Sequence, residues 1–115
     1  MAFRETELAE IKTAIDEYLR LKRPPPEIRD KLDIVCLVDG QSMVVAELRP
    51  VWRNPSETMT IPMAKATYVR SHGWWKVFWK RKDLKWHRYD PTPVVPTVKA
   101  FFRLITEDKY HCFWG

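Results

Sequence analysis

The sequence has few glycines and cysteines and no long apolar run. Its 115 residues include three glycines and two cysteines. No apolar run approaches the roughly 20 residues that a membrane span requires, so we expect no contact with a membrane. Residues 1–12 are charged and lack the apolar centre of a signal peptide. We therefore expect a cytoplasmic protein in which Cys36 and Cys112 are reduced thiols.

The composition predicts one folded domain over residues 1–115. A chain of this length suffices for a single hydrophobic core. Its hydrophobic fraction of 45% and aromatic fraction of 13% exclude an intrinsically disordered class. Nine prolines divide the chain into segments, and their positions help to place the ends of helices and strands.

Apolar periodicity predicts an α+β fold. Residues 4–22 have the three- and four-residue spacing of an amphipathic helix that ends before Pro24, and residues 96–106 have the pattern of a second helix. The expected strands lie at about residues 33–38, 42–50, 64–71, 74–81 and 84–89. Residues 53–63 are interpreted as a polar connection, and residues 110–115 as an aromatic tail that docks on the body. We predict an antiparallel meander of four or five strands, packed by an N-terminal and a C-terminal helix.

The positive charge of the chain is concentrated in residues 65–89. This segment holds eight Lys or Arg, seven aromatic residues and one carboxylate, Asp83, which gives 8 − 1 = +7. The whole chain has a net charge of +5, so the remaining residues sum to −2. Four of the six tryptophans lie in the same segment. A local cationic patch with aromatic rings is typical of a surface that binds a partner.

Strand alternation divides this segment between two sheet faces. Within residues 74–81, Trp75, Val77 and Trp79 share one face, while the other face mixes rings with lysines. Three interpretations stay open. Lysines and exposed rings could bind single-stranded nucleic acid, or a protein partner, including a second copy. In the third interpretation, which we favour, the rings stabilise cross-strand pairs and the lysine stems cover them.

Catalytic and metal-binding patterns are weak. His111 and Cys112 are adjacent, and adjacent residues rarely chelate one ion. Cys112 with a histidine has the groups of a thiol nucleophile. Asp33 or Asp39 with Glu47 and Arg49 faintly resembles the acid pair and base of metal-dependent nucleases. Core packing and a Glu47–Arg49 pair are the interpretations we prefer, so we predict no catalytic residue, no metal and no cofactor, and favour a non-enzyme.

Several separated blocks resemble one known family. DGQSMVVAELRPVWRNP, PMAKATYV, WWKVFWKRKDLKWHRYDP and YHCFWG, within residues 32–115, are similar to the uncharacterised bacterial family called domain of unknown function 3024. The resemblance implies a small, stand-alone cytosolic protein and no particular reaction.

Residue type and clustering select candidate binding residues. The candidates are Glu47, Arg49, Trp52, Lys65, Trp74, Lys76, Phe78, Lys80, Arg81, Lys85, Trp86 and Tyr89. We expect a small binding or interaction protein that acts through a basic, aromatic sheet surface. Single-stranded nucleic acid, a protein partner and a homodimer are the candidate partners, and a small metal-dependent or thiol enzyme is the remaining alternative.

Overall fold

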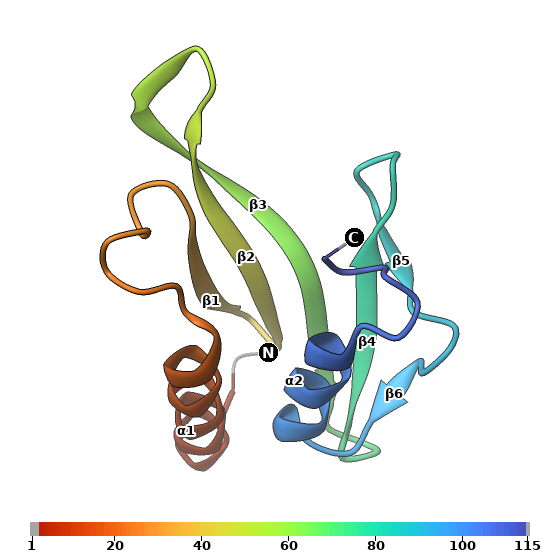
Figure 1. Ribbon diagram of the computed structural model, residues 1–115. Helices are drawn as coiled ribbons and strands as arrows, with labels where there is room; N and C mark the ends of the chain where they lie inside the picture. Colours follow the sequence, from red (N-terminus) through yellow and green to blue (C-terminus); the bar gives the residue numbers. More distant parts are fainter. Residues whose placement is uncertain (1–2, 115) are drawn as a thin grey trace.

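A computed structural model describes residues 3–114. The elements, in chain order, are α1 (Glu5–Lys22), β1 (Asp33–Asp39), β2 (Ser42–Val51), β3 (Asn54–Val69), β4 (Trp74–Lys80), β5 (Trp86–Arg88), β6 (Val94–Val95) and α2 (Val98–Glu107) (Figure 1). All strand pairs are antiparallel, in the order β1-β2-β3-β4-β5, and β6 also pairs with β4. The predicted α+β fold class, with a helix before and after an antiparallel sheet, is confirmed.

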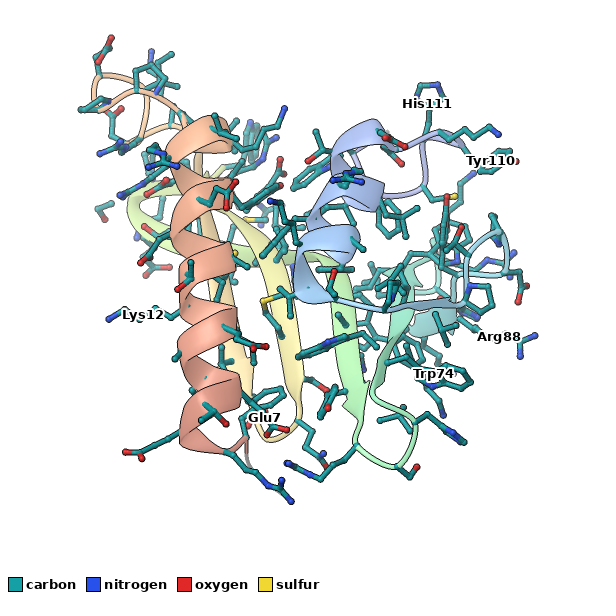
Figure 2. The ribbon with its side chains drawn as sticks, turned by 90° about the horizontal axis from the view of Figure 1, so that it is seen from below. Glu7, Lys12, Trp74, Arg88, Tyr110 and His111 are labelled. Atoms are coloured by element: carbon teal, nitrogen blue, oxygen red, sulfur yellow. The ribbon has the colours of Figure 1, made fainter. Side chains whose placement is uncertain are left out.

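Both helices pack on one face of the sheet (Figures 1 and 2). The two helices meet through Tyr18 and Phe102, whose stacked rings have centroids 4.4 Å apart. Phe3, before α1, packs on Trp75 of β4 with ring centroids 5.5 Å apart. The buried cluster joins side chains of both helices to alternate residues of the strands, namely Met43, Val45, Ala64, Ala66, Trp75 and Val77. The core is therefore built from one sheet face only.

The β2–β3 hairpin is longer than the sequence predicted. Residues 53–63 were expected to form a connection, but β3 begins at Asn54 and pairs with β2 almost to the turn at Trp52. Residues 52–60 are exposed, so this arm has no apolar period that a sequence could reveal. Antiparallel backbone hydrogen bonds hold it without burial. Pro62 lies at a register shift opposite Ala46, where a strand tolerates proline.

Other element bounds also differ from the prediction. Leu84 was placed in a strand over residues 84–89, but its φ is +62° and its N–H donates to the carbonyl of Arg81 at 2.9 Å. It belongs to the turn, so β5 begins at Trp86. The short strand β6 lies between prolines and was not predicted. The C-terminal helix starts at Val98 instead of residue 96, because the Thr97 hydroxyl caps it by accepting from the N–H of Ala100.

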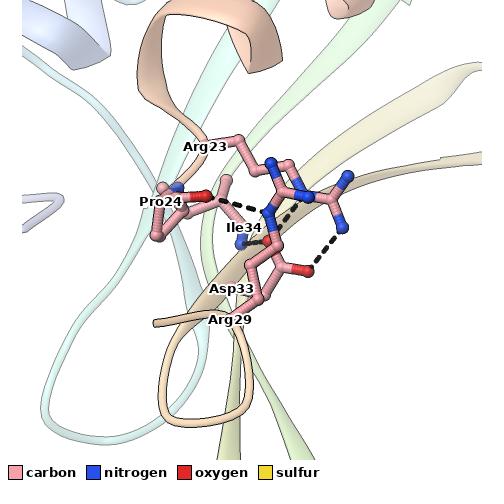
Figure 3. A network of polar contacts seen from close by, with 5 residues as sticks. All are labelled: Arg23, Pro24, Arg29, Asp33 and Ile34. Carbon is pink, nitrogen blue, oxygen red and sulfur yellow. Dashed lines mark hydrogen bonds and ion pairs between the residues drawn. The ribbon is translucent and has the colours of Figure 1, made fainter. Parts of the chain in front are cut away.

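The α1–β1 connection is pinned by a network of charged groups (Figure 3). Arg23 donates from Nε and from an Nη atom to the two carboxylate oxygens of Asp33, each at 2.9 Å. Arg29 Nε donates to the carbonyl of Pro24 at 2.8 Å. The Arg23 guanidinium beside Asp33 lowers the pKa of that carboxyl, against the opposing effect of burial. This charge-assisted fork fixes where β1 begins relative to the end of α1.

The C-terminal tail contacts the body through Phe113, which is buried, and Trp114, while Tyr110 stays 56% exposed. Asp108 ends α2 in the left-handed region, with φ of +41°. Its carboxylate accepts the N–H of Phe113 at 3.1 Å and the N–H of Trp114 at 2.9 Å. The Trp114 indole N–H donates to the carbonyl of Ile105 at 2.9 Å. Residue 115 lies outside the described residues. Within residues 3–114, neither helix is long and apolar enough to cross a membrane.

The hydrogen bonds from the N–H groups of Phe113 and Trp114 to the Asp108 carboxylate give a stability prediction. Asp108→Ala leaves two backbone N–H groups near the core without their acceptor, and we expect a loss of about 1–3 kcal/mol in the free energy of unfolding. Asp108→Asn keeps one acceptor oxygen and a residue that tolerates the left-handed region, so it should lose clearly less. Chemical denaturation measures both. Equal stability of Asp108→Ala and the natural sequence would contradict this role for the carboxylate.

Candidate cationic aromatic face

The face of β3, β4 and β5 that points away from the helices carries cations and rings. We call it the outer cationic face and define it by Lys65, Trp74, Lys76, Phe78, Lys80, Trp86 and Arg88. Cross-strand partners place these side chains beside one another: Lys65 lies opposite Phe78, and Lys80 lies opposite Trp86. Phe78 also lies opposite Arg88. The expected division of β4 is borne out, since Trp75 and Val77 are buried while Trp74 and Lys76 are exposed.

Two lysines and two rings form the centre of this face. Lys65 Nζ lies 4.8 Å from the centroid of the Phe78 ring and 5.1 Å from the Trp86 ring. Lys80 Nζ lies 5.2 Å from the centroid of the Trp86 ring. These are cation–π distances, and the contacts hold both ammonium groups close to the sheet. The rings of Phe78 and Trp86 stay partly exposed beside them.

The charge at the centre of the face is not balanced by acids. None of the outward positions of this face carries a carboxylate. Burial lowers the pKa of Lys65, and the positive charge of nearby Lys80 lowers it further. At one margin Arg88 Nε lies 2.8 Å from a carboxylate oxygen of Asp90, and both side chains are exposed. The centre of the face therefore presents positive charge that an anionic partner could neutralise.

An exposed ring lies at the N-terminal end of β4. Trp74 is 38% exposed, and its ring lies 4.6 Å from that of His72 in the β3–β4 turn. Figure 2 shows Trp74 and Arg88 on the β4–β5 side of the molecule, well away from α1. A ring at this end and two rings at the other end place aromatic surface along most of β4.

Asp83, the single carboxylate of residues 65–89, makes hydrogen bonds within the β4–β5 turn. Asp83 accepts the N–H of Lys85 at 3.0 Å and contacts Nε2 of His87 at 2.8 Å. The hydrogen bond from the Lys85 N–H lowers the pKa of the Asp83 carboxyl most, and the hydrogen bond with His87 lowers it further. Arg81 and Lys85 lie at this turn, and the Arg81 guanidinium is 5.7 Å from the Trp79 ring. Both cations are near the end of the outer cationic face instead of within it.

Four candidate residues lie elsewhere. Glu47 points to the helix side, where it lines a cavity of about 230 Å³ with Tyr18 and Trp114. Arg49 Nε lies 3.1 Å from a Glu47 carboxylate oxygen, as the structural interpretation of this pair expected. Trp52 is 87% exposed at the β2–β3 turn.

Tyr89 is the fourth of these residues. It is only 1% exposed, and its ring packs 4.9 Å from the ring of Phe113. Tyr89 therefore belongs to the core and is not available on the surface. The sequence could not reveal this contact, because Phe113 is far along the chain.

One residue of the outer cationic face was missed from the candidates. Arg88 lies two positions after Trp86 on β5, so it shares the face of Trp86. The strand alternation contained this signal. Arg88 thus adds a guanidinium to the face on β5, where it pairs with Asp90.

The described side chains give little support to thiol or metal chemistry. Burial raises the pKa of Cys36 to about 12, and it also raises the pKa of Cys112. A reactive thiol needs the opposite shift. Asp33 is held by Arg23, and residues 3–114 contain no group of three or more His, Cys, Asp or Glu side chains placed to hold a metal ion.

A comparison with family models decides the family. The model of the family described as Domain of unknown function (DUF3024) matches residues 3–115. The chain belongs to this family. The family match includes α1 and so extends beyond the blocks in residues 32–115 that resembled DUF3024 in the sequence. Searches of curated proteins and of solved structures give no match. The family is described as a domain of unknown function, so the match names no reaction and no ligand.

The electrostatic repulsion between Lys65 and Lys80 gives a pKa prediction. Lys80→Met removes a nearby positive charge and keeps an apolar stem over Trp86, so the pKa of Lys65 should rise towards its ordinary value. The rise should be partial, because burial of Lys65 remains. Lys80→Arg keeps the charge and should leave the pKa lowered. NMR titration of the Lys65 side chain measures all three proteins. A Lys65 pKa that Lys80→Met does not change would contradict this geometry.

Proposed function

We propose that this chain is a binding module whose outer cationic face takes single-stranded nucleic acid. The observation that carries the proposal is the alternation of rings and ammonium groups on a sheet face that neither helix covers. Lysines neutralise phosphates and release counterions. Unpaired bases stack on aromatic side chains, with roughly 1–3 kcal/mol per base. Sheet faces with both groups recognise single strands in several protein classes.

The spacing of the rings suits an extended strand. Trp74 lies four residues before Phe78 on β4, so the two positions are about 13 Å apart at about 3.3 Å per residue. Lys76 lies between them and shares their face. A single strand that follows β4 would meet one ring at Trp74, a cation at Lys76, and the Phe78–Trp86 pair beyond it. The double helix has no unpaired bases for these rings, so we expect a preference for single strands.

The cation–π contacts favour a second candidate, an acidic protein segment. Lys65 and Lys80 already lie over the rings of Phe78 and Trp86. A base that stacks on these rings must first displace an ammonium group, whereas a carboxylate can approach the lysines as they stand. Binding of an acidic protein segment would therefore require the positive charges of the outer cationic face but no stacking on its rings.

The proposal predicts salt-dependent binding of a labelled single-stranded oligonucleotide. Lys65→Ala, Lys76→Ala and Lys80→Ala, combined in one variant, should weaken binding. They should also flatten the dependence of log K on log salt by about 0.7 for each phosphate that is no longer neutralised. The matched control removes three lysines from the helix side, Lys12, Lys99 and Lys109, and should keep the slope of the natural sequence. Fluorescence anisotropy at low and moderate salt measures both.

A variant that lacks the Trp74 ring distinguishes between nucleic acid and an acidic protein segment as the partner. Trp74→Ala should weaken oligonucleotide binding with an unchanged salt slope, because it removes stacking and no charge. A polyglutamate peptide of the same charge should bind more weakly than the oligonucleotide. Equal affinity for both, with no effect of Trp74→Ala, would favour the acidic protein segment. No binding of the oligonucleotide at low salt, or equal slopes for the two triple variants, would overturn the proposal.

A further inference from the structure

β1 forms an edge of the sheet without the usual protection. It is the end strand, and its five central residues, 34–38, contain no proline and no charged side chain; Asp33 and Asp39 lie at its two ends. Natural edge strands are commonly blunted by such residues, by bulges or by a covering element. Leu37 and Val38 near its end are 48% and 43% exposed. By contrast, β5 at the other end has only three residues.

The turn after β1 determines which backbone groups face outward. Asp39 and Ser42 flank a two-residue turn with Gly40 at φ of +58°, which makes them a hydrogen-bonded pair. Bonding to β2 then alternates along β1. The residues that turn their N–H and C=O groups to the open side are Ile34, Cys36 and Val38.

One hydrogen bond supports this assignment. The Ile34 N–H donates to the carboxylate of Asp33 at 2.8 Å, which a group bonded to β2 could not do. Within residues 3–114, no other backbone group of β1 has a hydrogen bond outside the sheet. The N–H groups of Cys36 and Val38 are therefore available to a further strand.

The sequence of β1 matches itself when it is reversed. DIVCLVD is nearly symmetric about Cys36, with Asp33 and Asp39, Ile34 and Val38, and Val35 and Leu37 as matching pairs. We infer that β1 pairs with β1 of a second copy of this chain, antiparallel, about a two-fold axis at Cys36. Such an isologous contact sets similar apolar side chains against each other on both faces.

The backbone supplies four hydrogen bonds to this pairing. Each Cys36 N–H donates to the C=O of Cys36 of the partner subunit, and each Val38 N–H donates to the C=O of Ile34 of the partner subunit. The Ile34 N–H stays with Asp33. Asp33 faces Asp39 of the partner subunit, and Arg23, already bound to Asp33, provides the opposite charge at that end. A contact limited to an edge strand is small, so we expect a weak, concentration-dependent dimer.

The two-fold axis that relates two antiparallel neighbouring strands is perpendicular to the sheet. The outer cationic faces of the two copies therefore lie on the same side of the joined sheet. A nucleic acid long enough to reach both would bind with the gain of an intramolecular second contact. This consequence rests on the proposed function. The pairing itself does not, and its tests need no ligand.

Hydrogen exchange of the natural protein tests the pairing directly. The amides of Cys36 and Val38 should exchange at least about tenfold more slowly in concentrated than in dilute solution. The neighbouring amides of Val35 and Leu37 already bond to β2 and should change little. Sedimentation over the same concentrations should show a dimer. A monomer at every concentration, or a dimer whose Cys36 and Val38 amides stay unprotected, would overturn the inference.

A proline variant tests the same backbone groups. Val38→Pro removes an N–H that has no partner in the monomer, and should weaken the dimer at least about tenfold. Val38→Thr keeps the N–H and a β-branched side chain, and should still dimerise. Circular dichroism of dilute protein shows whether each variant is folded. If Val38→Pro is folded and dimerises like the natural sequence, the β1 edge is not the contact.

Discussion

The two-residue alternation of β4 is the constraint on which the rest of the structure depends. β4 pairs with β3 on one side and with β5 and β6 on the other, so its register fixes three neighbours. Trp75 and Val77 point to the helices, and burying each such side chain contributes about 1.5–3 kcal/mol. The same register forces Lys76 and Phe78 to the other face. The cationic, aromatic character of that face is therefore a consequence of how the core is built.

The C-terminal segment completes the core from the other end of the chain. The Asp108 carboxylate holds the N–H groups of Phe113 and Trp114, which places the Phe113 ring against Tyr89. Tyr89 follows β5 directly, so this contact also secures the strand that carries Trp86 and Arg88. Burial raises the pKa of Tyr89, as expected for a ring enclosed in this way. The position of the outer cationic face thus depends on the Asp108 hydrogen bonds and the Phe113–Tyr89 contact, which lie on the opposite side of the sheet.

The sequence predicted the features that repeat with a period, and missed those that do not. Apolar spacing and turn residues located both helices and at least part of β1 to β5, and alternation identified the core face of β4. The arm of β2 and β3 was missed because its residues are exposed and Pro55 lies within it, while its stability comes from backbone pairing. Tyr89 was assigned to the surface because its burial depends on Phe113, a contact between residues far apart in sequence. Glu47 and Arg49 were recognised as a pair, but their place on the helix side required the register of β2.

The central claim is that one sheet face forms the core and the opposite face binds a single strand. The indole N–H signals of the tryptophans, followed by NMR during titration with an oligonucleotide, test it most directly. Trp74 and Trp86 should shift progressively at low salt, and these shifts should diminish as salt is added. The signal of Trp75, buried under the helices, should stay in place. Shifts of Trp52 or Trp114 with none at Trp74 and Trp86 would contradict the account, because binding would then occur away from the outer cationic face.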